Sequence, residues 1–238
     1  MTAGPGTRKT KVLTEYKFDS REAASAAVAA RIAGLVAARL RRDDAAHFIV
    51  SGGTTPQMCF NYLSEYEMDW DKVQVALSDE RWVPNDHDDS NERLVRESML
   101  KGAASAGHVL PIYQSDLSAD EGAEALQTKK PDSGFACTMV GMGSDGHFAS
   151  LFPDADCLSE GLQLDNTRFY MPVRTSASPH PRISMTLSAL LDSGEVLLFF
   201  FGEEKLAVYE NAHTVDRTYP ITALLEQEKT PVSLYWAP

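Results

Sequence analysis

Short apolar runs alternate with longer stretches of helical periodicity along most of the chain. Runs typical of buried strands cover residues 12–18, 47–51, 73–78, 109–113, 135–140, 169–173, 195–201 and 232–236. Segments with helical spacing or helix-forming composition cover residues 19–42, 56–66, 91–100, 117–128, 186–191, 203–212 and 221–227. Strands that alternate with helices in this way predict an α/β fold, with a doubly wound, mostly parallel sheet flanked by helices.

Polar residues at the segment boundaries predict where individual helices begin. Asp19 and Glu22 have the spacing of a capping box, in which the glutamate side chain reaches back to the cap. Pro56 suits the first turn of the helix that follows it. Ser90 or Asn91 is the expected cap of the next helix. Each signal separates an expected strand or loop from the helix after it.

Composition and charge limit the class of protein. Of the 238 residues, 43% are hydrophobic and 24% are charged, as in an ordinary globular protein. No repeat or shift in composition marks a linker, so we expect a loose tail over residues 1–11 and a single domain over residues 12–238. The net charge of −12 disfavours binding to nucleic acid, because phosphate backbones would be repelled. A small anion is still a possible ligand, since a few local cations or a helix N-terminus can hold a phosphate.

Cysteine usage and hydropathy indicate the compartment. The three cysteines are odd in number, widely spaced and form no CxxC motif, which favours a reducing, cytoplasmic compartment. The first residues are polar and basic, unlike a secretory leader. The most apolar run, residues 196–201, is too short to cross a bilayer as a helix. We therefore expect no membrane partner.

Three expected strand ends carry glycines or functional side chains, and ligands gather at such ends in open α/β sheets. The first is Ser51-Gly-Gly-Thr-Thr-Pro56. Gly52 and Gly53 would let the backbone approach an anion closely, and the next helix would present free N–H groups. Thr54 and Thr55 add hydroxyl donors. A phosphate cradle and a simple tight turn both fit these six residues, and neither a Walker loop nor a GxGxxG motif is present.

The second strand end is Ser78-Asp-Glu-Arg81. A carboxylate of Asp79 or Glu80 could act as a base or orient a histidine. The Arg81 guanidinium could bind an anion through two hydrogen bonds. A salt-bridged loop anchor explains the same residues and, taken alone, is the favoured interpretation.

The third strand end is Gly141-Met-Gly-Ser-Asp-Gly-His147. Three glycines in one turn indicate positive φ angles or a close backbone approach. His147 follows this turn and can exchange protons near neutral pH. In this setting we favour a functional role for His147 over a packed or surface histidine. Asp145 could orient His147 or cap the turn, and we expect the structural role.

Two downstream cations could complete an anion site. Arg182 precedes an apolar run, and Lys205 falls in the first turn of an expected helix. A lysine is mildly unfavourable there for the helix dipole. This penalty hints that Lys205 meets an anion, although a solvated lysine explains the position equally well.

We expect no metal site and no covalent nucleophile. Asp86-His-Asp-Asp89 offers ligand types, but adjacent residues rarely point at one ion, and no HExxH or CxxC motif occurs. A solvated loop that enters a helix is the favoured interpretation of this segment. The cysteines lie in apolar sequence, and no GxSxG motif supports an α/β-hydrolase.

Six segments together resemble one family. They are SGGTTP at 51–56, DERWVP at 79–84, SN at 90–91, GMGSDGHFASLFP at 141–153, PRISMTL at 181–187 and GEEK at 202–205. In this order they resemble the 6-phosphogluconolactonases, within the wider glucosamine-6-phosphate deaminase superfamily. The resemblance runs from about Val12 to the C-terminus. Its most specific segment is 141–153, whereas SGGTTP alone would be weak.

The resemblance implies a Rossmann-like domain that hydrolyses 6-phospho-D-glucono-1,5-lactone without a cofactor or metal. It makes His147 the general base and places Asp79 and Arg81 beside the sugar ring. The phosphate site that it implies consists of Gly52, Gly53, Thr54, Arg182 and Lys205. The expected partner is therefore a small sugar-phosphate lactone, and we expect a monomer or a weak homo-oligomer.

Two other functions fit the same segments less well. Glucosamine-6-phosphate deaminases usually carry DEY where this chain has Asp79-Glu-Arg81, and they differ after the DGH of residues 145–147. Both departures favour the lactonase. A non-catalytic sugar-phosphate sensor could dispense with His147, which this chain retains. Ammonia release from glucosamine 6-phosphate would identify a deaminase, and binding of 6-phosphogluconate without hydrolysis would identify a sensor.

Overall fold

The larger sheet of the protein is entirely parallel. The computed structural model describes residues 13–238, so the tail expected over residues 1–11 lies outside the described residues. Within them, seven strands pair in the order β1-β10-β9-β6-β2-β3-β5. Their bounds are β1 Leu13–Lys17, β2 Ala46–Val50, β3 Val73–Leu77, β5 His108–Val109, β6 Thr138–Val140, β9 Val196–Phe201 and β10 Val232–Ala237. This arrangement confirms the predicted doubly wound, mostly parallel α/β fold.

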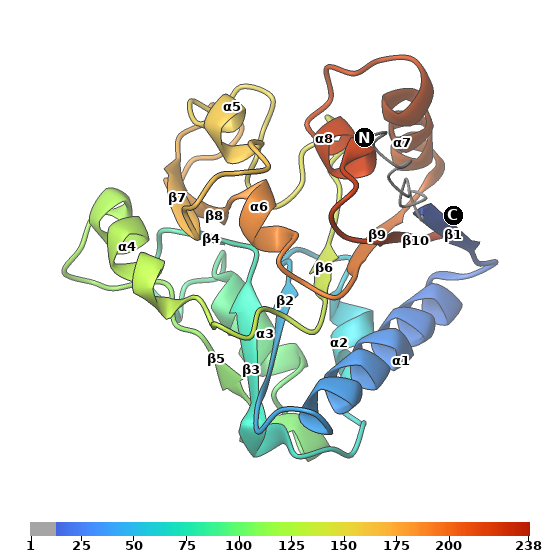
Figure 1. Cartoon of the computed structure of the whole chain (residues 1–238), viewed down its shortest axis with the longest axis vertical. Helices are drawn as coiled ribbons and strands as arrows, with labels where there is room; N and C mark the ends of the chain where they lie inside the picture. The colour runs from blue at the N-terminus through green and yellow to red at the C-terminus, as the bar shows by residue number, and fades with distance from the viewer. Residues whose placement is uncertain (1–12) are drawn as a thin grey trace, which may run out of the picture.

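Helices surround the strands, and α1 and α7 pack directly on the larger sheet. They are α1 Arg21–Leu40, α2 Gln57–Leu63, α3 Asn91–Ser98, α4 Ala119–Ala125, α5 Leu158–Gly161, α6 Leu187–Leu190, α7 Glu203–Thr214 and α8 Ile221–Glu226. Short 3₁₀ helices are η1 Trp70–Lys72, η2 Gly102–Ala106 and η3 Leu126–Lys129. Figure 1 shows α1 and α2 lying together on one side of the sheet, with α7 and α8 near the ends of β9 and β10.

A second, antiparallel sheet was not predicted from the sequence. It consists of β4 Asp79–Arg81, β8 Arg182–Met185 and β7 Tyr170–Val173, in that order. In Figure 1 this small sheet lies beside α5, above the carboxyl ends of β2 and β3. The segment expected to be only the end of the preceding strand therefore forms a strand of its own. Its pairing sets Asp79 opposite Ser184 and Arg81 opposite Arg182.

The chain reverses its winding direction between β2 and β6. From β2 it proceeds through β3 to β5 at one edge, and then returns to β6 on the other side of β2. The backbone N–H of Ser51 donates to the carbonyl of Met139, so the loops after β2 and β6 leave the sheet side by side. Such a switch point is where open α/β sheets bind ligands. It brings the glycine-rich turns 51–56 and 141–147 to one place.

The core lies on both faces of the larger sheet. Strands β2, β3, β6 and β9 are buried along nearly their whole length, as expected for parallel strands covered on both faces. Helix α1 buries Val28, Ile32 and Val36, and it packs on β2, β10 and α2. By length and composition α1 could also cross a membrane, a test that core helices of globular proteins pass as well.

Several expected boundaries were wrong in detail. The cap of α1 is Ser20, whose side chain accepts from the N–H of Ala23, so Glu22 falls one residue too early to form the predicted capping box. Pro56 is the N-cap residue of α2 rather than part of its first turn. Ser90 caps α3, as one of the two expected alternatives. The strand expected over residues 109–113 is only two residues long, and the helix expected over residues 117–128 divides into α4 and η3.

Candidate active site

One pocket collects every residue that the sequence singled out for the site. It has a volume of about 400 Å³ and lies over the carboxyl ends of β2, β6 and β9. Its lining includes Gly52, Gly53, Thr54, Asp79, Arg81, His147, Arg182 and Lys205. These residues come from five separate segments of the chain. The fold thus places the predicted residues together, while the role of each one is a separate question.

The glycine turn after β2 is shaped by a close contact with α3. A Cβ atom at Gly52 would lie 1.9 Å from Oδ1 of Asn91, so only glycine fits. Gly53 has a φ of 91°, a conformation that residues with side chains rarely adopt. Asn91 is itself buried, lines the pocket and donates from Nδ2 to the Asp79 carbonyl at 2.8 Å. The turn therefore lets a ligand approach its backbone closely, and the buried Asn91 side chain packs against it at Gly52.

His147 is held by the turn that carries it. Its ring Nδ1 lies 2.5 Å from Oδ1 of Asp145, and its backbone N–H donates to the same oxygen at 3.1 Å. An ionised carboxylate can only accept, so Nδ1 carries the proton and Nε2 keeps its lone pair. A Cβ atom at Gly143 would lie 2.3 Å from Nδ1, which explains a second glycine of the motif. Asp145 contacts both the ring and the backbone N–H of His147, so it orients the ring in addition to the structural role expected from the sequence.

The Phe152 ring contacts both His147 and Arg182. Its ring centroid lies 4.2 Å from that of His147, and the guanidinium carbon of Arg182 lies 5.2 Å from the Phe152 ring. A cation over an aromatic face is attracted by the ring quadrupole. The buried Phe152 therefore contacts both the candidate base and a cation of the pocket.

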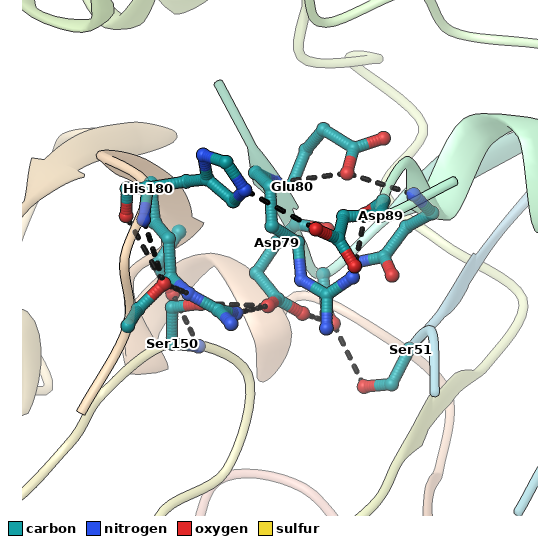
Figure 2. A network of polar contacts seen from close by, with 12 residues as sticks. Ser51, Asp79, Glu80, Asp89, Ser150 and His180 are labelled. Carbon is teal, nitrogen blue, oxygen red and sulfur yellow. Dashed lines mark hydrogen bonds and ion pairs between the residues drawn. The ribbon is translucent and has the colours of Figure 1, made fainter. Parts of the chain in front are cut away.

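Asp79 is the centre of a buried polar network (Figure 2). Its Oδ1 accepts from Ser78 Oγ at 2.7 Å, and Ser78 Oγ also lies 2.7 Å from Ser51 Oγ. Its Oδ2 accepts from Ser150 Oγ at 2.6 Å and from Arg182 Nη1 at 3.4 Å. Both oxygens are thus engaged by the protein, which favours a positioning role for Asp79 over that of a base. Neither Asp79 nor Glu80 orients His147, since Asp145 does so.

Arg182 is buried but not isolated. Its side chain is 12% exposed, and the Asp79 side chain that pairs with it is 7% exposed. Burial lowers the pKa of Arg182, and the charge of Asp79 opposes that shift. Ser150 and Ser178 accept further hydrogen bonds from the guanidinium. The arginine consequently presents a fixed positive charge to the pocket.

Of the positively charged residues that line the pocket, Lys205 has the fewest hydrogen-bond and ion-pair partners among the described residues. It lies in the first turn of α7, half-buried, and within the described residues its ammonium group makes no hydrogen bond or ion pair. Burial lowers its pKa, opposed by the charges of Glu204 and Asp145. A cation placed at a pocket wall against the helix dipole suits a ligand with negative charge.

Arg81 lines the pocket, whereas its neighbour Glu80 does not. Nη1 of Arg81 donates to the Asp89 carbonyl at 2.5 Å, while its buried Nε has no partner among the described residues. Glu80 lies outside the pocket lining and accepts from the backbone N–H groups of Arg81, Asn91 and Glu92, each at 2.8 Å. Burial raises the pKa of Glu80 to about 7, although those N–H groups oppose the shift. Glu80 anchors α3, whereas Arg81 lines the pocket and has a buried Nε without a partner among the described residues.

The sequence reasoning missed the supporting roles of three residues: Asn91, Ser150 and Phe152. All of them lie within the two motifs at 141–153 and 90–91, so their proximity to the site could have been expected. Their contacts depend on pairing between distant segments.

The three cysteines are unpaired. Burial raises the pKa of Cys157 to about 11 and those of Cys59 and Cys137 further, consistent with the expectation that they are poor nucleophiles.

Comparison with known proteins identifies relatives of this chain. The family described as glucosamine-6-phosphate isomerases/6-phosphogluconolactonase matches residues 19–236. A 6-phosphogluconolactonase of Mesorhizobium japonicum is 36% identical over 226 residues, covering 93% of this chain and 94% of that protein. One of Pseudomonas putida is 38% identical over 220 residues, covering 89% of each chain. A crystal structure of a 6-phosphogluconolactonase from Shewanella baltica has a TM-score of 0.88 at 35% identity, covering 98% of this chain and all of that one. The chain belongs to the glucosamine-6-phosphate isomerase/6-phosphogluconolactonase family.

Proposed function

We propose that the pocket hydrolyses 6-phospho-D-glucono-1,5-lactone to 6-phosphogluconate, with His147 as the general base. The observation that carries this proposal is the placement of two features in one pocket. One is a histidine whose Nδ1 is held by Asp145, and the other is a lysine without a hydrogen bond or ion pair among the described residues, in a pocket that a glycine turn also lines. A proton acceptor and an anion site in one pocket suit a phosphorylated ester substrate. The names of relatives at 34–38% identity support the same reaction.

The phosphate would bind at the glycine turn. Gly52 and Gly53 allow the backbone N–H groups to approach the anion, and Thr54 adds a hydroxyl donor. Lys205 and Arg182 would supply positive charge from two other segments. Because the phosphate takes no part in the reaction, its binding free energy can position the lactone carbonyl at the other end.

The chemical step would use the Nε2 lone pair of His147. Nε2 removes a proton from water while the water oxygen forms a bond to C1, and the carbonyl electrons move to the carbonyl oxygen. When the tetrahedral intermediate collapses, the bond between C1 and the ring oxygen breaks. The protonated Nε2 then donates to that oxygen, so the proton is returned. Asp145 would stabilise the imidazolium, and a positioned base of this kind contributes about 10²–10⁴-fold.

Arg81 is the favoured donor to the developing oxyanion. The alternative is the turn 141–147, but its N–H groups at Gly143, Gly146 and His147 already donate within the turn. The buried Nε of Arg81 has no partner among the described residues and belongs to a residue that lines the pocket. A preorganised charged donor in a pocket contributes most where negative charge develops in the transition state.

A substrate comparison tests this proposal. The lactone is generated in situ by glucose-6-phosphate dehydrogenase, and its decay is compared with the spontaneous rate at fixed pH. Acceleration by the wild-type protein, together with no ammonia from glucosamine 6-phosphate, is the expected result. Ammonia release would favour the deaminase, for which Asp79 would have to take a C2 proton. Binding of 6-phosphogluconate without faster hydrolysis would favour a sensor.

A further inference from the structure

A second cluster of metal-ligand side chains lies outside the pocket. His87 and Asp89 belong to the exposed loop before α3, and His180 comes from the loop before β8, 91 residues further along the chain than Asp89. One ligand atom from each of these residues lies within 4.8 Å of the other two. Figure 2 shows the His180 ring directed at the Asp89 carboxylate. The sequence analysis dismissed residues 86–89 as a metal site because adjacent residues rarely converge, but the fold adds a ligand from a distant segment.

We propose that His87, Asp89 and His180 bind a divalent transition metal of the zinc class. Two imidazole nitrogens and one carboxylate oxygen form the kind of three-residue ligand set that holds Zn²⁺ with a further position open to water. Mg²⁺ and Ca²⁺ prefer sites built from oxygen alone, so this set selects against them. The proposal does not depend on the lactonase reaction.

The distances need only a small adjustment to hold an ion. Nε2 of His180 lies 3.1 Å from Oδ2 of Asp89, and Nδ1 of His87 lies 3.8 Å from the same oxygen. Metal bonds of about 2.0–2.2 Å put the ligand atoms of a tetrahedral ion roughly 3.3–3.6 Å apart. The two rings also face each other nearly edge-on, at a centroid distance of 5.5 Å and an angle of 78°. The cluster is therefore close to a binding arrangement before any metal arrives.

His87 already presents the nitrogen that a metal requires. The backbone N–H of Asp89 donates to its Nδ1 at 3.1 Å, so this nitrogen carries a lone pair and no proton. A metal at Nδ1 would replace that hydrogen bond, and no proton would have to leave. His180 faces the Asp89 carboxylate through Nε2, which therefore carries the ring proton here, so metal binding at Nε2 requires the neutral ring to hold its proton on Nδ1 instead.

Neighbouring arginines leave the Asp89 carboxylate available. Arg93 pairs with Asp88 and donates to the Asp86 carbonyl. Arg81 donates to the backbone carbonyl of Asp89 and not to its side chain. Asp89 therefore keeps both carboxylate oxygens for the two histidines or for an ion between them.

A metal here would join two walls of the active-site pocket. Asp89 is bound through its carbonyl to Arg81, and His180 is two residues before Arg182. Both arginines line the pocket, whereas the three proposed ligands do not. An ion would tie the loop before α3 to the loop before β8 and reduce the motion of both.

Zinc titration of the whole protein tests the proposal. Protein freed of metal by a chelator competes with a chromophoric zinc dye, and Zn²⁺ alone is the probe. We expect one equivalent of Zn²⁺ bound at micromolar concentration. His180→Gln and His87→Gln should each weaken that binding about 10–100-fold or more. His108→Gln, at an exposed histidine in β5, is the matched control and should bind as the wild type does.

A second measurement keeps the test independent of how the variants fold. In proton NMR spectra of the wild-type protein, ring signals assigned to His87 and His180 should shift on addition of one equivalent of Zn²⁺, while those of His108 stay. Wild-type binding only at millimolar Zn²⁺ would overturn the proposal. So would unchanged binding in both variants, or a first equivalent that shifts His147 in place of His87 and His180.

Discussion

Asp145 Oδ1 accepts two hydrogen bonds from His147, one from the backbone N–H at 3.1 Å and one from ring Nδ1 at 2.5 Å. One carboxylate oxygen thus fixes both the position of the residue and the tautomer of its ring. A Cβ atom at Gly143 would collide with that ring, so glycine at this position is needed for the His147 ring to pair with Asp145. The consequences can be measured separately from those of removing His147 itself.

Asp145→Asn should lower kcat about 10²–10⁴-fold with little change in KM. The asparagine amide can donate to Nδ1, which would leave the proton on Nε2 and remove the base. Steady-state kinetics with the in situ lactone assay measure the effect. Asp165→Asn, at an exposed aspartate outside the pocket lining, is the control and should retain wild-type kcat. A wild-type kcat for Asp145→Asn would show that the hydrogen bond to Nδ1 does not matter for the reaction.

Lys205→Met should act mainly on substrate binding. Loss of a charge-assisted hydrogen bond to phosphate, about 1.5–3 kcal/mol, corresponds to a rise in KM of roughly 10–100-fold. The KM for the phosphorylated lactone measures it, and Lys129→Met, at an exposed lysine outside the pocket lining, should leave KM unchanged. If KM stayed constant while kcat fell, Lys205 would belong to the reacting end and the phosphate site would be misplaced.

Gly143→Ala should inactivate the protein while leaving it folded. A Cβ atom would lie 2.3 Å from Nδ1 of His147, so the ring must move away from Asp145. Gly34→Ala is the matched control, because a Cβ atom there meets nothing within 4 Å and the position is inside α1. The control should raise the free energy of unfolding by about 0.5–1 kcal/mol and keep full activity. Wild-type kcat for Gly143→Ala would contradict the described geometry of the turn.

Glu80 should make the stability of the protein fall as pH rises. Burial raises its pKa from an ordinary 4.5 to about 7, so ionisation is less favourable in the folded state than in the unfolded state. Its contribution to the free energy of unfolding is therefore complete below about pH 4.5 and is lost as pH rises through 7. The loss between pH 5 and pH 8 is about 2–3 kcal/mol.

Urea unfolding across this pH range isolates the effect of Glu80. The glutamine of Glu80→Gln cannot titrate, so this variant should not show the fall in the free energy of unfolding between pH 5 and pH 8. The substitution also removes an acceptor from the N-terminus of α3. Glu228→Gln, at an exposed glutamate, should follow the wild type. The free energy of unfolding of the wild type could instead rise between pH 5 and pH 8 relative to that of Glu80→Gln. In that case the N–H groups of α3 would stabilise the Glu80 carboxylate by more than burial destabilises it.

The parallel sheet was predictable because its signals are local. Strands such as β2 and β9 are short apolar runs bounded by glycine, and α1 shows clear helical spacing, so each segment indicates its own structure. The small antiparallel sheet was not predictable in this way. Its strand β4 is Asp-Glu-Arg, a polar sequence that becomes a strand only because β8 pairs with it from about 100 residues away. The single domain, the compartment and the oligomeric state remain predictions.

The candidate site likewise has features that the sequence predicted and contacts that it did not. His147, Lys205 and the glycine turn at 51–56 follow strands or begin a helix, so their common location followed from the fold class. The bonds that position them were not predictable, since the hydrogen bonds of Asp79 with Ser150 and Arg182 join segments 71 and 103 residues apart. Local spacing does not encode such contacts. The same reason explains why the cluster of His87 and His180 was missed.

The rate of lactone hydrolysis by His147→Ala, beside the wild-type protein, tests the central claim most directly. The lactone is formed in situ at fixed pH, its decay is followed against the spontaneous rate, and circular dichroism confirms that both proteins are folded. The account predicts clear acceleration by the wild type and a loss of about 10²–10⁴-fold in kcat for the variant. A wild-type rate equal to the spontaneous rate, or a variant as active as the wild type, would contradict it.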